Sequence, residues 1–317
     1  MRRNHLIGRY IGVERGPLLI CFGGMHGNEP AGVKAIELMI KMLEVEPITN
    51  PDFRYRGRFL GILGNPEAYR QRKRYITEDL NRMWRDSTLA HLQKTPSAEL
   101  TSEQAAIKNI LTLIIRELQI YQPDELIFLD LHTTSSTGGI FTLIPDDEPS
   151  VRLALDLPAP VIEGMLAGLE GTTLHFFEQN RFKMPVRRIS FEAGHHDDPL
   201  SINRCIAAIT CCMRGAGAVQ THDVESQHVK VLRDYSQGLP KLSQLVYRHA
   251  ITPDDEFVMR PGFENFTPIR QGDLLAYDRM GQVTSPMDGR ILLPLYQKQG
   301  SDGYFLVQEL NNHQTKH

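Results

Sequence analysis

The segment of residues 18–32 constrains the fold more than any other stretch of this chain. It begins as an apolar run that ends in two consecutive glycines, and it then places a histidine and a glutamate three residues apart, at His26 and Glu29. From Pro30 onward, apolar residues recur at the spacing of a helix. This order predicts a strand, a tight loop and a helix. Because ligands bind beyond the carboxyl ends of the strands in an open α/β sheet, we expect the loop to hold a ligand.

Strand and helix patterns alternate through the first two thirds of the chain. The apolar runs expected to be strands cover residues 58–63, 125–131, 141–145 and 188–194. A turn over 47–51 is expected to follow the first helix, a capping box of Thr101 and Gln104 opens another helix, and residues 200–215 form the last. This alternation predicts an α/β fold with a mostly parallel sheet and helices on both faces.

The character of the sequence changes from about Val219. Turn signals come close together, and short β-rich runs lie between them, at 256–259, 274–277, 290–295 and 304–307. We therefore expect two domains. Residues 1–218 would form an α/β catalytic domain, and residues 219–317 a smaller all-β domain that narrows access to the site.

Composition limits the classes of function open to this chain. With 317 residues, 41% of them hydrophobic and 23% charged, it is typical of a soluble globular protein with a substantial core. The formal net charge of -3 gives no basic footprint, so we expect no nucleic-acid or membrane partner. No apolar run approaches the roughly 18 residues of a membrane span, and no signal peptide is visible. With only four cysteines, we expect reduced thiols and a cytoplasmic location, and a homo-oligomer remains open.

His26, Glu29 and His132 form a candidate metal site. Each lies at the end of a predicted strand, and His132 closes an Asp-Leu-His sequence. Catalytic zinc commonly takes three nitrogen or oxygen ligands from the protein and keeps a fourth position for water. The alternative is that His26 caps a helix and that His132 is a hydrogen-bonded interior histidine. The two glycines before His26 and the helix after Glu29 favour the metal site.

Glu192 ends another predicted strand and is the candidate general base. A metal-bound water needs a group that takes its proton and later protonates the leaving amine, and a glutamate whose pKa is raised by apolar surroundings can do both. The alternative is a solvated glutamate at a strand end. His195 and His196 are interpreted as loop residues without a metal role, with outer-shell groups or a second metal site as the alternative.

Arg74, Asn81 and Arg82 form a segment rich in hydrogen-bond donors. Arginine binds carboxylates through two parallel hydrogen bonds, so we interpret this segment as the recognition site for an acidic substrate. It could also polarise the carbonyl of the bond that is cleaved. A solvated charged face is the alternative interpretation.

Taken in order, these motifs resemble those of the aspartoacylase/succinylglutamate desuccinylase family, which is related to the zinc carboxypeptidases. The matching residues are His26-x-x-Glu29, Asn65-Pro66, Arg74, the Asp-Leu-Asn-Arg of 79–82, the Asp-Leu-His-Thr-Thr of 130–134 and the Glu-Ala-Gly of 192–194. The resemblance covers the catalytic half of the chain and continues more loosely into the β-rich part. It implies a zinc-carboxypeptidase-like sheet flanked by helices, and an enzyme that cleaves linear amide bonds.

The resemblance also implies roles for single residues. The three candidate ligands would hold one zinc ion per chain, with Glu192 as general base and acid. Arg74 would help to polarise the amide carbonyl and steady the oxyanion. Asn81 and Arg82 would bind the carboxylate of the amino-acid part of the substrate.

Two further assignments follow from the resemblance. An arginine shortly before the catalytic glutamate would hold a substrate carboxylate; Arg181 fits best, and Arg187 or Arg188 could compete. Tyr304 best matches a tyrosine that the C-terminal domain of aspartoacylases brings over the active site. Phe176-Phe177 and the His-His-Asp-Asp loop after the glutamate depart from the aspartoacylase pattern, which leaves the zinc chemistry intact but not an assignment to N-acetylaspartate.

We therefore predict a zinc-dependent hydrolase that splits an N-acyl amino acid carrying at least one carboxylate. A metallocarboxypeptidase acting on short peptides and a non-catalytic ligand-binding relative are the alternatives, and the presence of Glu192 favours an enzyme. Residues 272–290 are similar to lipoyl or biotinyl modules, but the turn at 277–282 has no lysine, so no carrier function is expected.

Overall fold

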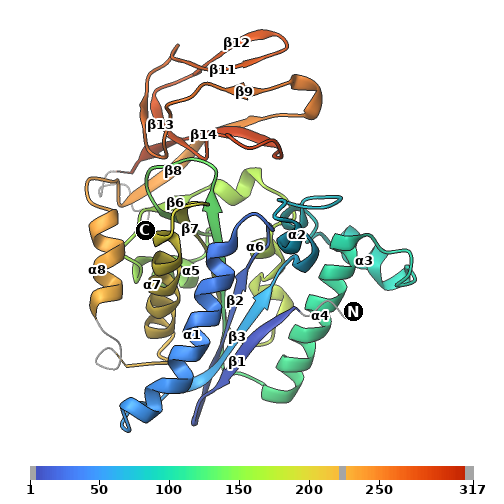
Figure 1. Ribbon diagram of the computed structural model, residues 1–317, viewed down its shortest axis with the longest axis vertical. Coiled ribbons are helices and arrows are strands. Elements are labelled where there is room, and N and C mark those ends of the chain that lie inside the picture. Colours follow the sequence, from blue (N-terminus) through green and yellow to red (C-terminus); the bar gives the residue numbers. More distant parts are fainter. Residues whose placement is uncertain (1–4, 221–225, 311–317) are drawn as a thin grey trace.

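The computed structural model describes residues 5–220 and 226–310, and one large sheet runs through it (Figure 1). Within these residues the sheet has 11 strands, in the order β1 (Leu6–Ile11), β3 (Arg56–Leu63), β2 (Glu14–Gly23), β4 (Leu126–Thr134), β7 (Val186–His195), β5 (Phe141–Leu143), β6 (Val161–Glu163), β8 (Leu242–Ala250), β14 (Asp302–Glu309), β13 (Gly289–Leu292) and β10 (Pro268–Ile269). β3, β2, β4 and β7 are parallel, and antiparallel β1 and β5 flank them. The predicted α/β class is confirmed.

Helices cover both faces of this sheet. One face carries α1 (Pro30–Thr49), α5 (Glu148–Leu155) and α7 (Leu200–Gly215), and the other carries α4 (Ser102–Tyr121), with α3 (Asp86–Lys94) and α6 (Thr173–Phe176) beside it. The shorter helical segments are α2 (Pro66–Gln71), η1 (Leu80–Arg82), η2 (Met165–Gly168), η3 (Gln179–Arg181) and η4 (Pro253–Asp255). Across the described residues, every helix is too short or too polar to cross a membrane.

Alternation of side chains along the parallel strands builds the two cores. On β2, Leu19 and Cys21 point to the core under α1 and α7, whereas Leu18, Ile20 and Phe22 point to the core under α4. All five are fully buried. Burial on both faces explains why these strands appear in the sequence as unbroken apolar runs.

Two helices depart from the sequence-based expectations. α1 continues through Pro47 to Thr49 instead of ending in a turn there, and Pro47 lies in its exposed last turn. A proline at this position removes a backbone hydrogen bond and crowds the preceding turn, but only two helical residues follow it. α8 (Ser226–Tyr235) lies where only strands were expected. It forms because Val229 and Leu232 are about one helical turn apart and both pack on the core under α7, beside which α8 lies in Figure 1.

The C-terminal strands continue the main sheet. β8 pairs in parallel with β6, and β14 and β13 extend the sheet from there. A second sheet of β12 (Gly281–Thr284), β11 (Leu274–Asp278) and β9 (Val258–Met259) lies beyond them, at the top of Figure 1. The β-rich part is therefore joined to the α/β part by backbone hydrogen bonds as well as by the chain.

Candidate active site

The candidate site lies where the α4-facing side of the parallel strands becomes polar. On β4, this side changes from Phe128 to Asp130 and His132, and on β7 Glu192 is the register partner of His132. The opposite side of β4 stays apolar as far as Leu131. Because the strands are parallel, their polar ends meet at one edge of the sheet.

The loop after β2 reaches the same edge of the sheet. Its path depends on two glycines, Gly24 and Gly27, at positions with little room for a side chain. The N–H of Glu29 donates to the carbonyl of His26 at 3.2 Å, which turns both side chains toward β4. Gly24 has a φ of +65°, and a Cβ on Gly27 would meet the carbonyl carbon of Ala68 at 2.0 Å. A larger residue at either position would displace the backbone that presents His26 and Glu29.

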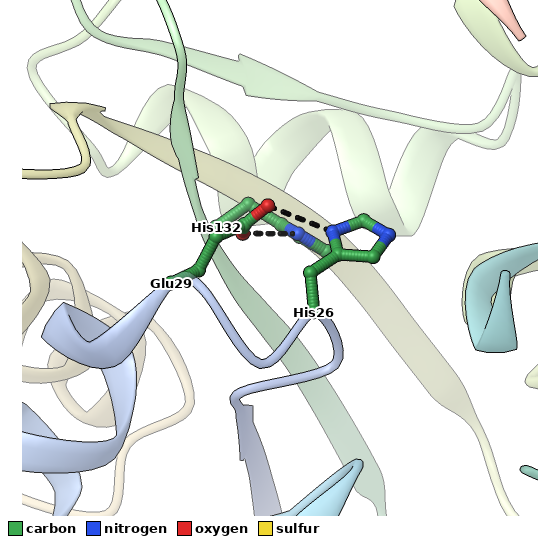
Figure 2. Close-up of side chains that lie close together, drawn as sticks. All are labelled: His26, Glu29 and His132. Carbon is green, nitrogen blue, oxygen red and sulfur yellow. Dashed lines mark hydrogen bonds and ion pairs between the residues drawn. The ribbon is translucent and has the colours of Figure 1, made fainter. Parts of the chain in front are cut away.

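The structure brings His26, Glu29 and His132 together (Figure 2). The two carboxylate oxygens of Glu29 divide between the histidines: Oε1 lies 2.8 Å from His26 Nδ1, and Oε2 lies 3.0 Å from His132 Nδ1. All three side chains are buried, and their ligand atoms lie within 4.8 Å of one another. Two imidazole nitrogens and one carboxylate oxygen make a donor set that fits a metal ion such as zinc.

Each histidine also contacts a second carboxylate with its other nitrogen. His26 Nε2 lies 3.1 Å from Asp79 Oδ1, and His132 Nε2 lies 3.2 Å from Asp130 Oδ2. Carboxylates in this position fix the orientation of metal-binding histidines and raise their basicity. Burial opposes the charged form of His132, but the pair of Asp130 and Glu29 outweighs it and raises the pKa of His132 well above its usual value.

Glu192 lines the same pocket as the three candidate ligands. Burial raises the pKa of its carboxyl group to about 8, with His132 opposing the shift and Glu29 adding to it. Within the described residues, its Oε2 has no hydrogen-bond partner. A buried carboxyl group with a raised pKa and a free oxygen is suited to taking and returning a proton.

Arg74 reaches the pocket from a loop that a buried glutamate holds in place. Glu103, in the first turn of α4, accepts hydrogen bonds from the backbone N–H groups of residues 76 and 77 at 2.8 and 3.2 Å. Arg74 Nη2 lies 3.1 Å from Asp79 Oδ2, and its Nη1 lies 3.6 Å from Glu29 Oε1. The guanidinium group therefore stands beside the candidate metal ligands.

Asn81 and Arg82 also line the pocket, and each already has a protein partner. Asn81 Oδ1 accepts a hydrogen bond from the backbone N–H of Thr173 at 3.0 Å. Arg82 Nη2 lies 3.2 Å from Asp302 Oδ2, and Arg248 Nε donates to the other oxygen of Asp302 at 2.6 Å. A carboxylate of the chain itself thus contacts the arginine that the sequence assigned to a substrate carboxylate.

The two remaining predicted substrate-binding residues lie outside the lining of this pocket. Arg181, at the end of η3, pairs with Asp86. Tyr304 is fully buried in the C-terminal part, where its ring stacks on His249 with centroids 4.9 Å apart. Neighbouring residues of a strand point to opposite faces, and on β14 it is Phe305 that lines the pocket.

The competing candidates for these roles lie outside the lining as well. Arg187 and Arg188 pair with carboxylates elsewhere, on Glu125 and Asp147. His196 lies outside the lining too, but its Nδ1 is 2.7 Å from the hydroxyl of Thr133, which belongs to the lining.

Sequence reasoning missed three carboxylates that shape the site. Asp130 had a local signal, because residues two apart in a strand share a face and it precedes His132 by two. Asp79 belongs to the Asp-Leu-Asn-Arg motif of 79–82 that was selected for its Asn81 and Arg82. Only its contact with His26 was missed. Asp302 had no local signal, because it meets Arg82 across 220 positions of the chain.

Comparison with known proteins identifies the family of this chain. The model of the succinylglutamate desuccinylase/aspartoacylase catalytic domain matches residues 15–167. The chain is 38% identical over 292 residues to the succinylglutamate desuccinylase of Pseudomonas fluorescens, covering 89% of this chain and 80% of that protein. It is 30% identical over 127 residues to a Nostoc sp. protein named "Probable aspartoacylase", a match that covers 40% of this chain and 38% of the relative. The chain belongs to the succinylglutamate desuccinylase/aspartoacylase family.

A solved structure shares the fold over nearly the whole chain. The crystal structure of succinylglutamate desuccinylase from Vibrio cholerae superposes with a TM-score of 0.60 at 18% sequence identity, and the match covers 94% of this chain and 82% of that one. At this identity the likeness speaks for the fold. It extends past the catalytic domain, so the β-rich C-terminal part belongs to the shared architecture.

Proposed function

We propose that this protein is a zinc-dependent amidohydrolase that cleaves the amide bond of an N-acyl amino acid with at least one carboxylate. The observation that carries the proposal is the buried His26, Glu29 and His132 set in one pocket with Glu192. The names of the relatives, desuccinylases and aspartoacylases, support an acyl-nitrogen bond as the one that is broken.

His26, Glu29 and His132 would hold the zinc ion, which lowers the pKa of water and polarises a carbonyl group when it is bound. Glu192 takes the proton of the attacking water and later gives it to the leaving nitrogen. Arg74, which stands beside Glu29, donates hydrogen bonds to the oxyanion as its charge develops.

We also propose that residues 219–317 narrow the mouth of the pocket. Gln297, Ser301 and Asp302 belong to its lining, and Asn28 Nδ2 donates to Gln297 Oε1 at 2.9 Å between the two parts of the chain. Such a mouth favours a small N-acyl amino acid over a long peptide. The four cysteines are free and buried, which supports a reducing compartment and hence a cytoplasmic location.

The test is amine release by the purified full chain from N-acyl amino acids and from dipeptides with free amino termini, with the zinc content measured in parallel. We expect turnover of N-acyl amino acids that a chelator abolishes and added zinc restores. Faster turnover of dipeptides would favour the carboxypeptidase alternative. Zinc-loaded protein that cleaves neither class would contradict the proposal and favour a ligand-binding role.

A further inference from the structure

Part of the lining of the pocket that holds the candidate metal ligands is apolar, and we call this part the apolar wall. It comes from both parts of the chain, with η2, the start of α6, the end of β5, the segment after β13 and β14 each contributing. Its members are Leu143, Met165, Leu166, Leu169, Leu174, Leu293, Leu295 and Phe305. Several of them also belong to the buried core that packs β5 and β6 against β13 and β14, so this core holds much of the wall in place.

The arginines of the pocket already have carboxylate partners. Among the described residues of the lining, the arginines are Arg74 and Arg82. Arg74 faces Asp79 and Glu29, and Arg82 faces Asp302. An arginine that is paired within the protein offers a second anion fewer donors and less positive charge than a free one.

The balance of charge limits how many substrate carboxylates the pocket can hold. Apart from the candidate metal ligands and Glu192, the charged residues of the described lining are the carboxylates of Asp130 and Asp302 and the two arginines. Where Arg82 and Arg248 share Asp302, one positive charge remains in excess, which suffices for one carboxylate. A second carboxylate would have only Arg74, which already faces Asp79 and Glu29, and a buried charge without a partner is strongly disfavoured.

We propose that the preferred substrate carries one carboxylate and an apolar group, in contrast to the two carboxylates of N-acetylaspartate and the three of N-succinylglutamate. This inference rests on the proposed function and names its substrate class. The carboxylate lies at Asn81 and Arg82, and the apolar group lies against the wall around Leu169. Each additional buried methylene group then improves kcat/KM by about three- to fourfold until the wall is filled.

The first test compares kcat/KM of the zinc-loaded full chain for N-acetylleucine, N-acetylphenylalanine and N-hexanoylglycine with that for N-acetylaspartate and N-succinylglutamate. We expect the best apolar substrate to exceed both acidic ones at least about 30-fold, as expected for three buried methylene groups at three- to fourfold each. N-hexanoylglycine and N-acetylleucine distinguish an apolar acyl group from an apolar side chain. A higher value for either acidic compound overturns the inference and leaves the hydrolase proposal intact.

Two matched variants test the wall itself. Leu169→Ala removes a side chain that lines the pocket, and Leu245→Ala trims the same core from outside the lining. We expect Leu169→Ala to raise KM for the apolar substrates several-fold relative to Leu245→Ala, with little change for N-acetylaspartate. Equal effects of the two variants would mean that Leu169 supports the fold only, and would overturn the inference.

A binding measurement separates this inference from the proposed function. In the Glu192→Gln variant, calorimetry reports the affinity for N-acetylleucine and N-acetylaspartate without turnover. Tighter binding of N-acetylleucine supports the inference even if the wild-type chain hydrolyses neither compound, and tighter binding of N-acetylaspartate contradicts it. Asp302→Asn frees Arg82 and is expected to shift the preference toward N-acetylaspartate; an unchanged preference would show that Asp302 does not set the charge limit.

Discussion

The two faces of β4 and β7 carry different side chains at the same level of the sheet: one face is apolar where the other is polar. Toward α1 and α7, Leu129, Leu131 and Phe191 continue the core past the level of Asp130. Toward α4, the core stops at Phe128, and Asp130, His132 and Glu192 follow. The apolar side fixes the position of each strand, so the polar side can present buried charges in a defined geometry. Substitutions at neighbouring positions can therefore separate catalysis from stability.

The largest effect is expected on the polar side, from Glu192→Gln. The amide cannot take a proton from water, so kcat for the best substrate should fall about 100- to 10,000-fold. The zinc content and the thermal unfolding temperature of the zinc-loaded protein should stay close to those of the wild type. Kinetics and metal analysis on the same preparation check this, and a normal rate would remove Glu192 from the mechanism.

On the apolar side, Leu129→Ala should act on stability. Leu129 is fully buried, and its truncation leaves a cavity that costs about 2–5 kcal/mol of the free energy of unfolding. The folded fraction should keep most of its kcat, because Leu129 points away from the pocket. Chemical denaturation combined with kinetics at low temperature tests the contrast. A loss of kcat as large as that of the glutamine variant would show that the two sides are not independent.

Asp130→Asn, one residue further on, should act on the metal. Loss of the carboxylate behind His132 is expected to weaken zinc binding by about 10- to 100-fold. Asp79→Asn is the matched change behind His26 and should behave alike. Competition with a chelator of known zinc affinity measures both. Unchanged zinc affinity in both variants would contradict the orienting role of these aspartates.

A further effect concerns the metal-free protein and its pH dependence. The pKa of Glu192 in the folded chain, about 8, exceeds its unfolded value of about 4.3. Its contribution to stability is therefore fully present below the unfolded pKa and is lost as the pH rises through 8. Relative to Glu192→Gln, the wild-type chain should lose thermal stability between pH 5 and about 8. If the unfolding temperatures of the two proteins changed equally with pH across this range, the raised pKa of Glu192 would be contradicted.

Local patterns in the sequence predicted much of the fold. The helix at 200–215 has the predicted ends, and Thr101 and Gln104 form the predicted capping box. Both depend on residues a few positions apart. α8 was missed because only Val229 and Leu232 mark its apolar side, and this pattern is too sparse to stand out between turn signals.

The candidate site was predictable where its residues end strands. His26, Glu29 and His132 meet because parallel strands bring their carboxyl ends to one edge. The partner of Arg82 could not be predicted, because it depends on how β14 approaches the pocket. Tyr304 illustrates the same limit: a shift of one residue along a strand decides which face a side chain joins, and motif matching does not fix that register.

The ladder between β6 and β8 joins the two parts of the chain that line the pocket. Leu242, Ser243 and Gln244 are in register with residues 161–163, so the ladder runs without a break from the metal-binding edge to the C-terminal wall. The α/β part and the C-terminal part cannot rotate apart without breaking the backbone hydrogen bonds between β6 and β8. If residues 219–317 narrow the mouth as proposed, the entrance would work as a fixed sieve, and the side chains around the opening would set the size of an admitted molecule. Broadening the range of accepted compounds would require reshaping those side chains, since loosening the joint between the two parts would destroy the sheet itself.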